Sequence, residues 1–196
     1  MTDAAQIGHE RLMAKILQCD ACRLRLTRNN AVLYRGPTRS PLMLVGEAPG
    51  QQEDRFGKPF VGPSGQILGG LLARAGIKDS SVYLCNVVKC RPPANRNPTE
   101  TEIRCCRPWM IDQVRLVKPN VIVSMGKVAT VALTGTHGPM NVLLEHDDLC
   151  CGFCGEIPVI PIYHPAYLLR RLDDPTTAPI FKDTIARLER AWMQAT

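Results

Sequence analysis

The chain has 196 residues, 45% of them hydrophobic, and 24 Lys and Arg against 18 Asp and Glu give a net charge of +6. This length suits one domain, residues 1–196, that buries roughly 70% of its unfolded surface without help from disulfides. No apolar run approaches the ~20 residues of a membrane span, and the N-terminus is charged rather than signal-like. We therefore expect a soluble, cytoplasmic monomer with no membrane partner, and its charge leans toward a polyanion without requiring one.

The N-terminal part predicts a helix followed by a basic loop. Residues 5–18 have the apolar spacing of an amphipathic helix. The side chains expected on its buried face are Ile7, Leu12, Ile16 and Leu17. The arginine-rich stretch 23–40 contains several turn formers, so we interpret it as a loop with one short strand at 31–34.

Strands and helices alternate along the rest of the chain. Strands are expected at 42–46, 82–88, 120–125 and 157–162, and helices at 66–76, 99–117, 126–133 and 178–195. Thr99 to Glu102 resembles a capping box, and residues 134–149 are expected to be irregular or to form a hairpin. The alternation predicts an α/β fold, three-layer α/β/α with a central, mainly parallel four-stranded sheet.

The loop 46–65 is the segment most suited to chemistry. It follows a buried strand, and ligands of open α/β sheets bind outside the carboxyl ends of the strands. It contains five glycines, an aromatic ring at Phe60 and three carboxylates, Glu47, Glu53 and Asp54. Acidic groups, backbone donors and a stacking surface are therefore expected together.

Nine cysteines, in a chain without a secretory signal, indicate metal binding or catalysis before disulfides. Cys19 and Cys22 form a C-x-x-C pair, and with Cys90 and Cys106 they could hold an iron–sulfur cluster or a tetrahedral zinc. Spacing alone does not separate these metals, nor Cys106 from its neighbour Cys105.

The remaining cysteines allow other readings. Cys150, Cys151 and Cys154 contain a second C-x-x-C, which could hold a second metal or consist of free thiols. Cys85 lies in a predicted buried strand, and we interpret it as a small core residue.

Six segments together resemble the iron–sulfur uracil-DNA glycosylases called family four, within the uracil-DNA glycosylase superfamily. They are C-x-x-C at 19–22, GEAPGQQED at 46–54, GKPFVGPSGQ at 57–66, NVVKCRPPANRNP at 86–98, CRPW at 106–109 and HPAYLLR at 164–170. The resemblance implies a compact α/β/α domain, a structural [4Fe–4S] cluster, and hydrolysis of the N-glycosidic bond of deoxyuridine in DNA, which initiates base excision repair. It also selects Cys106 over Cys105 as the fourth cluster ligand.

Three side chains have the chemistry that this activity needs. A base inside a duplex must be extruded into a pocket and stacked on an aromatic ring, which Phe60 supplies. Asn86 offers an amide donor and acceptor that complement uracil, whereas cytosine presents the opposite arrangement. His164 can donate to the uracil oxygen on which charge builds as the bond breaks. The backbone around the flipped base is expected to come from Gly46, Ala48, Pro49 and Gly50.

The chain departs from the superfamily's best-known branch at two positions. That branch has an aspartate where this chain has Ala48, so another carboxylate must position water or stabilise the sugar cation. Glu47 is our first choice, with Glu53 and Asp54 as alternates. The same branch has a thymine-excluding tyrosine where this chain has Gly50, so thymine must be rejected by other means, such as loop packing around Glu53.

Basic residues on two loops are expected to contact DNA phosphates. They are Lys89, Arg91, Arg96, Arg170 and Arg171.

Three rival hypotheses remain at this point. A metal-stapled nucleic-acid-binding module would keep the cysteines and arginines without needing Glu47, Asn86 and His164 together. A relative that traps uracil covalently uses a histidine after the motif at 86–90, and the stretch 91–99 contains none, which favours turnover. A redox iron–sulfur enzyme lacks support because GEAPGQ is not a dinucleotide fingerprint.

Overall fold

The computed structural model describes residues 4–146 and 148–196. Within these residues five strands form one sheet in the order β1-β3-β2-β4-β5, in which only β1 runs antiparallel to its neighbour. The strands are β1 (Tyr34–Arg35), β2 (Leu42–Gly46), β3 (Tyr83–Asn86), β4 (Val121–Met125) and β5 (Val159–Ile162). The predicted fold class is confirmed, but the sheet has five strands where four were predicted. The fifth is β1, which overlaps at Tyr34 the short strand expected at 31–34 and was not counted in the predicted sheet.

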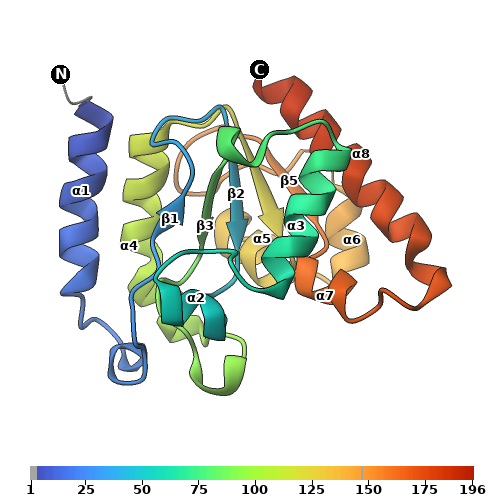
Figure 1. Ribbon diagram of the computed structural model, residues 1–196. Helices are drawn as coiled ribbons and strands as arrows, with labels where there is room; N and C mark the ends of the chain where they lie inside the picture. Colours follow the sequence, from blue (N-terminus) through green and yellow to red (C-terminus); the bar gives the residue numbers. More distant parts are fainter. Residues whose placement is uncertain (1–3, 147) are drawn as a thin grey trace.

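Helices cover both faces of this sheet (Figure 1). They are α1 (Ala4–Leu17), α2 (Gln51–Phe56), α3 (Pro63–Arg74), α4 (Glu100–Val117), α5 (Lys127–Thr134), α6 (Met140–Glu145), α7 (Pro165–Leu169) and α8 (Ala178–Ala195). Helices α3, α7 and α8 pack on one face and α4 and α5 on the other, while α1 lies outside α4. No helix of this described part is long and apolar enough to cross a membrane.

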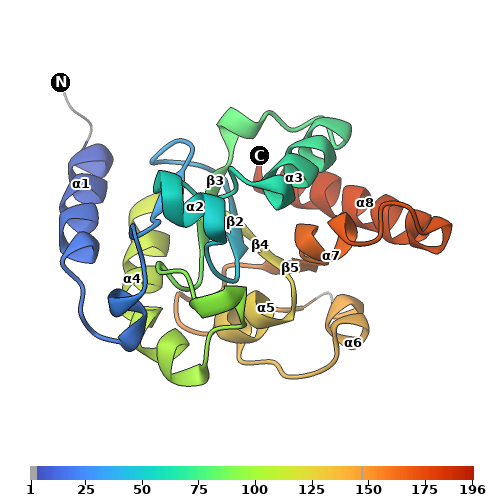
Figure 2. The same cartoon turned by 60° about the horizontal axis from the view of Figure 1, so that its bottom comes forward.

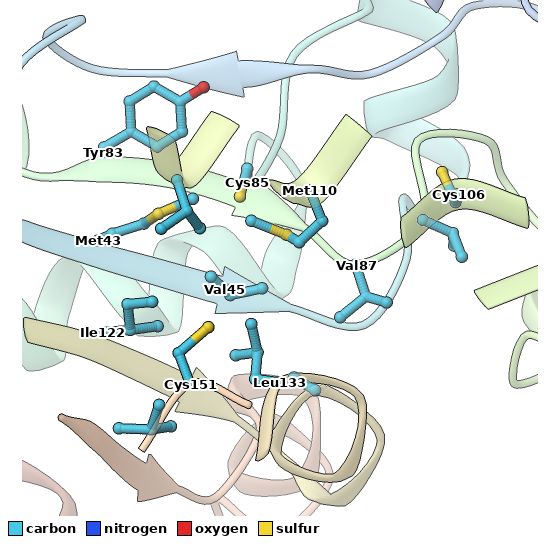
Figure 3. Packing of buried hydrophobic residues seen from close by; sticks show 14 of the residues in the cluster. Met43, Val45, Tyr83, Cys85, Val87, Cys106, Met110, Ile122, Leu133 and Cys151 are labelled. Carbon is cyan, nitrogen blue, oxygen red and sulfur yellow. The ribbon is translucent and has the colours of Figure 1, made fainter. Parts of the chain in front are cut away.

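The central strand β2 shows why the sheet needs two helical layers. All five of its residues are buried, and successive side chains point to opposite faces. Leu42 and Leu44 join the core with α3 and α8, whereas Met43 and Val45 join the core with α4 and α5 (Figure 3). A strand buried on both faces reads as a continuous apolar run, which is the pattern LMLV.

Helix α1 buries a narrower stripe than its sequence predicts. Leu12 and Ile16 are buried, but Ile7 and Leu17 are 38% and 54% exposed, so those two assignments were wrong. The reason is that α1 packs mainly on α4, and one helix covers only part of another helix's apolar side.

Three short helices were not predicted. Helix α6 lies within 134–149, where we expected irregular structure or a hairpin, α2 lies within the loop 46–65, and α7 directly follows His164. Each has five or six residues, which is too short for helical periodicity to be distinctive. Residue 147 of the first segment lies outside the described residues.

The carboxyl ends of the parallel strands lie at one edge of the sheet, which comes forward in Figure 2. Because β3 and β4 flank β2 on opposite sides, the strand order reverses at β2, and ligands of α/β sheets bind at such a reversal. Helices α2, α5 and α7 and the segment after β3 lie around this edge (Figure 2). Helix α4 begins nearby with the predicted capping box, since Thr99 and Glu102 exchange side-chain to backbone hydrogen bonds.

Candidate active site

A cavity of about 350 Å³ opens at this edge of the sheet, a size typical of small-molecule sites. The predicted site residues that line it are Glu47, Ala48, Pro49, Gly50, Glu53, Phe60, Asn86, Arg96, His164 and Arg170. They come from four separate segments, and the fold therefore brings together most of the residues that the sequence singled out.

The Asn86 amide and the Phe60 ring converge over Gly46. Gly46 on β2 and Asn86 on β3 are register partners in the parallel pairing of these two strands. A Cβ atom on Gly46 would lie 2.5 Å from Asn86 Oδ1 and 2.6 Å from Phe60 Cζ, so only glycine allows this approach. Asn86 is 2% exposed, and its Oδ1 atom has no hydrogen-bond partner within the described residues. A buried acceptor left unpaired costs roughly 1–3 kcal/mol, which indicates that a ligand donor pairs with it.

The Phe60 ring is held by a strained turn. Phe60 has a φ of 55°, a left-handed conformation that is uncommon for a bulky residue. The turn is closed by Gly65, where a Cβ atom would lie 2.0 Å from the Phe60 carbonyl oxygen. Backbone strain of this kind concentrates at functional sites, and here it presents an aromatic face to the cavity.

His164 lies two residues beyond β5 and caps helix α7. Its Nδ1 atom accepts a hydrogen bond of 3.1 Å from the Ala166 backbone N–H. Burial, with a smaller contribution from the charge of Arg170, lowers the pKa of His164 to about 4. The ring is therefore neutral near pH 7, and because Nδ1 is an acceptor, Nε2 carries the proton. His164 is a neutral hydrogen-bond donor at the cavity.

Among the three loop carboxylates, that of Glu47 is the one with no hydrogen bond or ion pair to a described residue. Its side chain lines the cavity, and no hydrogen bond or ion pair to its carboxylate is found within residues 4–146 and 148–196. Burial raises its pKa above the ordinary value of 4.5. A partly desolvated, unengaged carboxylate is available to act on a ligand or on water.

Glu53 also lines the cavity, but backbone donors occupy both of its oxygens. Oε2 accepts from the Gly50 N–H at 3.1 Å, and Oε1 accepts from the Val61 and Gly62 N–H groups at 3.0 and 2.8 Å. The carboxylate therefore ties the start of α2 to the start of α3. Gly50 is needed here, because a Cβ atom would lie 2.7 Å from Glu53 Oε2.

Asp54 is fully buried and lies outside the lining of the cavity. Its carboxylate accepts hydrogen bonds from the Asn29 backbone and side chain and from the Asn30 backbone, at 2.6 to 3.1 Å. It fastens the loop after the first cysteines to α2. These contacts leave it no part in the cavity.

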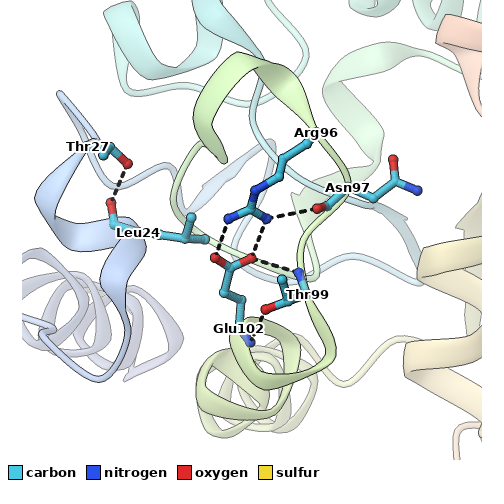
Figure 4. Close-up of polar contacts among 6 residues, drawn as sticks. All are labelled: Leu24, Thr27, Arg96, Asn97, Thr99 and Glu102. Carbon is cyan, nitrogen blue, oxygen red and sulfur yellow. Dashed lines mark hydrogen bonds and ion pairs between the residues drawn. The ribbon is translucent and has the colours of Figure 1, made fainter.

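The basic residues after β3 do not all point outward toward a DNA phosphate. Lys89 is 1% exposed and its ammonium donates to the Asn86 carbonyl, so its predicted phosphate contact was wrong. Arg96 lines the cavity and is held by Glu102 in a two-pronged ion pair of 2.7 and 2.8 Å (Figure 4). Arg91 is partly exposed and donates to Asn95 Oδ1.

The two arginines after His164 differ from each other. Arg170 is exposed and lines the cavity. The Arg171 guanidinium lies 4.0 Å from the centre of the Tyr167 ring. Arg170 is therefore the better placed of the two at the rim.

Sequence reasoning missed several residues that line the cavity. They are Ser64, Pro92, Asn95, Asn97 and Ala166. The sequence feature that could have pointed to Ser64 is its position directly after the Gly-Pro pair at the start of α3. No sequence signal marked Asn95, which with Ala94 adopts a left-handed backbone at φ 54°.

The predicted cluster ligands surround a second, smaller cavity. Cys19 and Cys22 come from the turn after α1, Cys90 follows β3, and both Cys105 and Cys106 of α4 reach it. Three of these sulfurs accept N–H donors, the pattern that tunes metal-bound thiolates. The donors are Trp109 Nε1 to Cys19 at 3.3 Å, Arg28 Nη1 to Cys90 at 3.0 Å and the Lys89 backbone to Cys106 at 3.3 Å.

The spacing of these thiols bears on the kind of metal. In the part of the chain that the structure describes, no three His, Cys, Asp or Glu side chains are arranged to hold one metal ion. In a [4Fe–4S] cluster each cysteine binds a different iron atom, so its ligands stand farther apart than those of a single zinc. Thiols from three segments line this one cavity, and thiolates are the ligands that iron–sulfur clusters and zinc sites share, so the chemistry of these residues fits either group.

The second cysteine group does not reach that cavity. Cys151 belongs to the hydrophobic core, Cys154 packs against the same core and Cys150 is exposed. Burial raises the pKa of the Cys154 thiol to about 12, and its neighbour Cys151 acts in the same direction. Cys85 is completely buried, as the sequence predicted.

Comparison with known proteins gives the family. Residues 33–189 match the family model described as the uracil DNA glycosylase superfamily. A type-4 uracil-DNA glycosylase of Thermotoga maritima is 38% identical, over 86% of this chain and 87% of that protein. Those of Pyrobaculum aerophilum and Archaeoglobus fulgidus are 39% and 36% identical over more than four fifths of both chains. The chain therefore belongs to the uracil-DNA glycosylase superfamily and, within it, to the type-4 family.

Proposed function

We propose that this protein flips uracil out of DNA into the cavity of 350 Å³ and hydrolyses its N-glycosidic bond. Its class, a DNA N-glycosylase and hence a hydrolase, follows from the family. The observation that carries the proposal is Asn86, a buried residue that lines the cavity with Phe60 and His164 and whose Oδ1 acceptor has no partner among the described residues.

Base recognition follows from that amide. Asn86 Oδ1 would accept the uracil N3–H, and Nδ2 would donate to the neighbouring carbonyl. Cytosine would place an acceptor and a donor against the same two atoms, which leaves both unpaired. The Phe60 ring supplies the stacking face that a flipped base needs.

Bond cleavage is divided between Glu47 and His164. As the bond between C1′ and the base nitrogen breaks, its electron pair passes into the uracil ring and positive charge develops on the sugar. The neutral His164 Nε2–H would donate to the uracil oxygen that gains charge. Glu47 would stabilise the cation and take a proton from the water that attacks C1′. Glu53 and Asp54 serve as positioning groups, because backbone and amide donors occupy their carboxylates.

Thymine would be rejected by the loop that Glu53 ties together. Gly50 leaves room for the Glu53 carboxylate rather than for a bulky ring, and that carboxylate fixes the backbone at 50 and 61–62 against the cavity. We propose that this fixed backbone stands where the thymine methyl would lie. Arg170, exposed at the rim, would contact a phosphate.

A [4Fe–4S] cluster bound by Cys19, Cys22, Cys90 and Cys106 would hold the N-terminal turn against the segment after β3. The N–H donors to three of these sulfurs support that assignment. Iron and sulfide analysis, with an absorbance band near ~400 nm expected of such a cluster, tests it. A colourless protein that contains zinc would contradict it.

A turnover assay tests the function against its rivals. Excess single-stranded oligonucleotide with one uracil is incubated with the protein and then treated with alkali, which cleaves at abasic sites. We expect cleaved product in molar excess over the protein. Product limited to one equivalent would indicate covalent trapping, and none would indicate a binding module.

The ionisation of Glu47 should determine how kcat depends on pH on the acid side. Glu47 must be ionised to act, and burial raises its pKa above 4.5, while His164 stays neutral down to about pH 4. We therefore expect kcat to fall as pH falls toward and below the raised pKa of Glu47, with no separate limb from His164 at the ordinary imidazole pKa of 6.5. Glu47→Gln should lower kcat on the order of a hundredfold and remove this acid limb, which single-turnover rates would show. An unchanged acid limb would exclude Glu47.

Replacing Gly46 by a larger residue should disturb the site sterically. Gly46→Ala places a methyl group against Asn86 Oδ1 and Phe60 Cζ, so the amide and ring must separate. A shift of about 1 Å in a reacting geometry costs up to ~100-fold in rate, and we expect kcat/KM to fall at least tenfold. The matched control is Gly70→Ala, since a Cβ atom there meets nothing within 4 Å and a helix gains up to ~1 kcal/mol from alanine. Full activity in Gly46→Ala would show that the two side chains do not act together.

A further inference from the structure

Lys89 is a buried cation whose charge is not balanced by a carboxylate. It is 1% exposed, and no ion pair to it is found within the described residues. Its ammonium donates to the backbone carbonyl of Asn86. Burying an unbalanced charge costs several kcal/mol, so an anion is expected close to this side chain.

Cysteine sulfurs, which can become anionic, lie around the same small cavity as Lys89. Lys89 lines the cysteine cavity together with Cys90 and Cys106, and its own backbone N–H donates to Cys106 Sγ at 3.3 Å. Four metal-bound thiolates would carry the negative charge that this ammonium lacks.

Lys89 therefore contacts both the cysteine site and the residue that would read the base, Asn86. One end of the residue donates to a cluster ligand, and the other end donates to the carbonyl of the residue whose amide faces the cavity. Two residues separate Lys89 from Asn86, and both positions lie in the segment that leads from the end of β3 to Cys90. A change in the charge of the cysteine site thus has a direct route to the Asn86 backbone.

We propose that Lys89 is a positioning residue that balances the charge of the cysteine site and, through the Asn86 carbonyl, holds the uracil-reading amide in place. This inference rests on the proposed function. It predicts that base recognition depends on the cluster even though the cluster does not touch the base.

The test compares four variants of the cluster-containing protein. Lys89→Met removes the charge and the donor, and Lys89→Gln removes the charge but keeps an N–H donor. Arg28→Met removes a different cation, one that donates to Cys90 but does not contact Asn86. Lys182→Met, on the exposed side of α8, controls for loss of a surface charge.

Two readouts separate the two roles. The first is the midpoint potential of the cluster, which should become more negative when a nearby positive charge is removed. The second is the ratio of Kd values for two oligonucleotides, one with deoxycytidine and one with 2′-fluoro-2′-deoxyuridine, whose glycosidic bond resists cleavage. That ratio reports base reading without the chemical step.

We expect Lys89→Met to shift the potential and to lower the Kd ratio about tenfold, as expected for a lost hydrogen bond from a charged group. Arg28→Met should shift the potential and keep the ratio, and Lys89→Gln should shift the potential while recovering much of the ratio. If Lys89→Met does not fold, the midpoint potential of the cluster in Lys89→Gln tests the inference instead. A wild-type potential or a wild-type ratio in a folded Lys89→Met protein would overturn the inference. Absence of iron or of uracil release in the wild type would instead overturn the proposed function.

Discussion

Asn86→Asp is expected to lower uracil release on the order of a thousandfold, because a site built to pair with a ligand's polar edge rejects a mismatched edge strongly. The substitution keeps the shape of the side chain but replaces the amide donor by a second acceptor. That acceptor would face a uracil oxygen, and its charge would oppose the charge that develops on the leaving base. Initial rates on a uracil oligonucleotide measure the loss.

The same variant should gain measurable activity on cytosine, whose amino group can donate to the new carboxylate. Asn141→Asp is the matched control, since Asn141 lies exposed on α6 and changes the net charge equally. Unchanged base preference in Asn86→Asp would remove Asn86 from the reading edge.

His164→Ala is expected to lower kcat about a hundredfold, the usual cost of removing one preorganised donor to a developing anion. Because the neutral ring acts on charge that appears only in the transition state, affinity for DNA should be nearly unchanged. Single-turnover rates and equilibrium binding measure the two quantities separately. His137→Ala, at an exposed position between α5 and α6, controls for loss of an imidazole. Equal losses in rate and affinity would make His164 a binding residue.

The sequence predicted the parts of the fold that have strong periodicity. Strands β2 and β4 and helices α4 and α8 follow from long apolar patterns or clear caps, and the structure confirms them. The sequence pattern misplaced strand β1, which was expected at 31–34, and did not indicate helix α2, because two and six residues carry too little pattern. Their positions are set by pairing with β3 and by the Glu53 and Asp54 contacts, which form only in the folded chain.

The candidate site was predictable where strand ends deliver polar side chains. Asn86 ends β3 and His164 follows β5, so parallel pairing brings both to one edge. The roles of the three loop carboxylates could not be separated by sequence, because they depend on which backbone N–H groups surround each one. Lys89 was misassigned for a related reason. A lysine before Cys-Arg-Pro-Pro reads as a surface charge, and only the packing of β3 against α4 buries it.

Free uracil released by the wild-type protein is the most direct measurement of the central claim. Three oligonucleotides of one sequence, with uracil, thymine or cytosine at a single position, are incubated with the folded protein, and the liberated bases are quantified by mass spectrometry. We predict release of uracil in molar excess over the protein, with little thymine or cytosine. An intact uracil strand after incubation with the folded protein would contradict the proposed function.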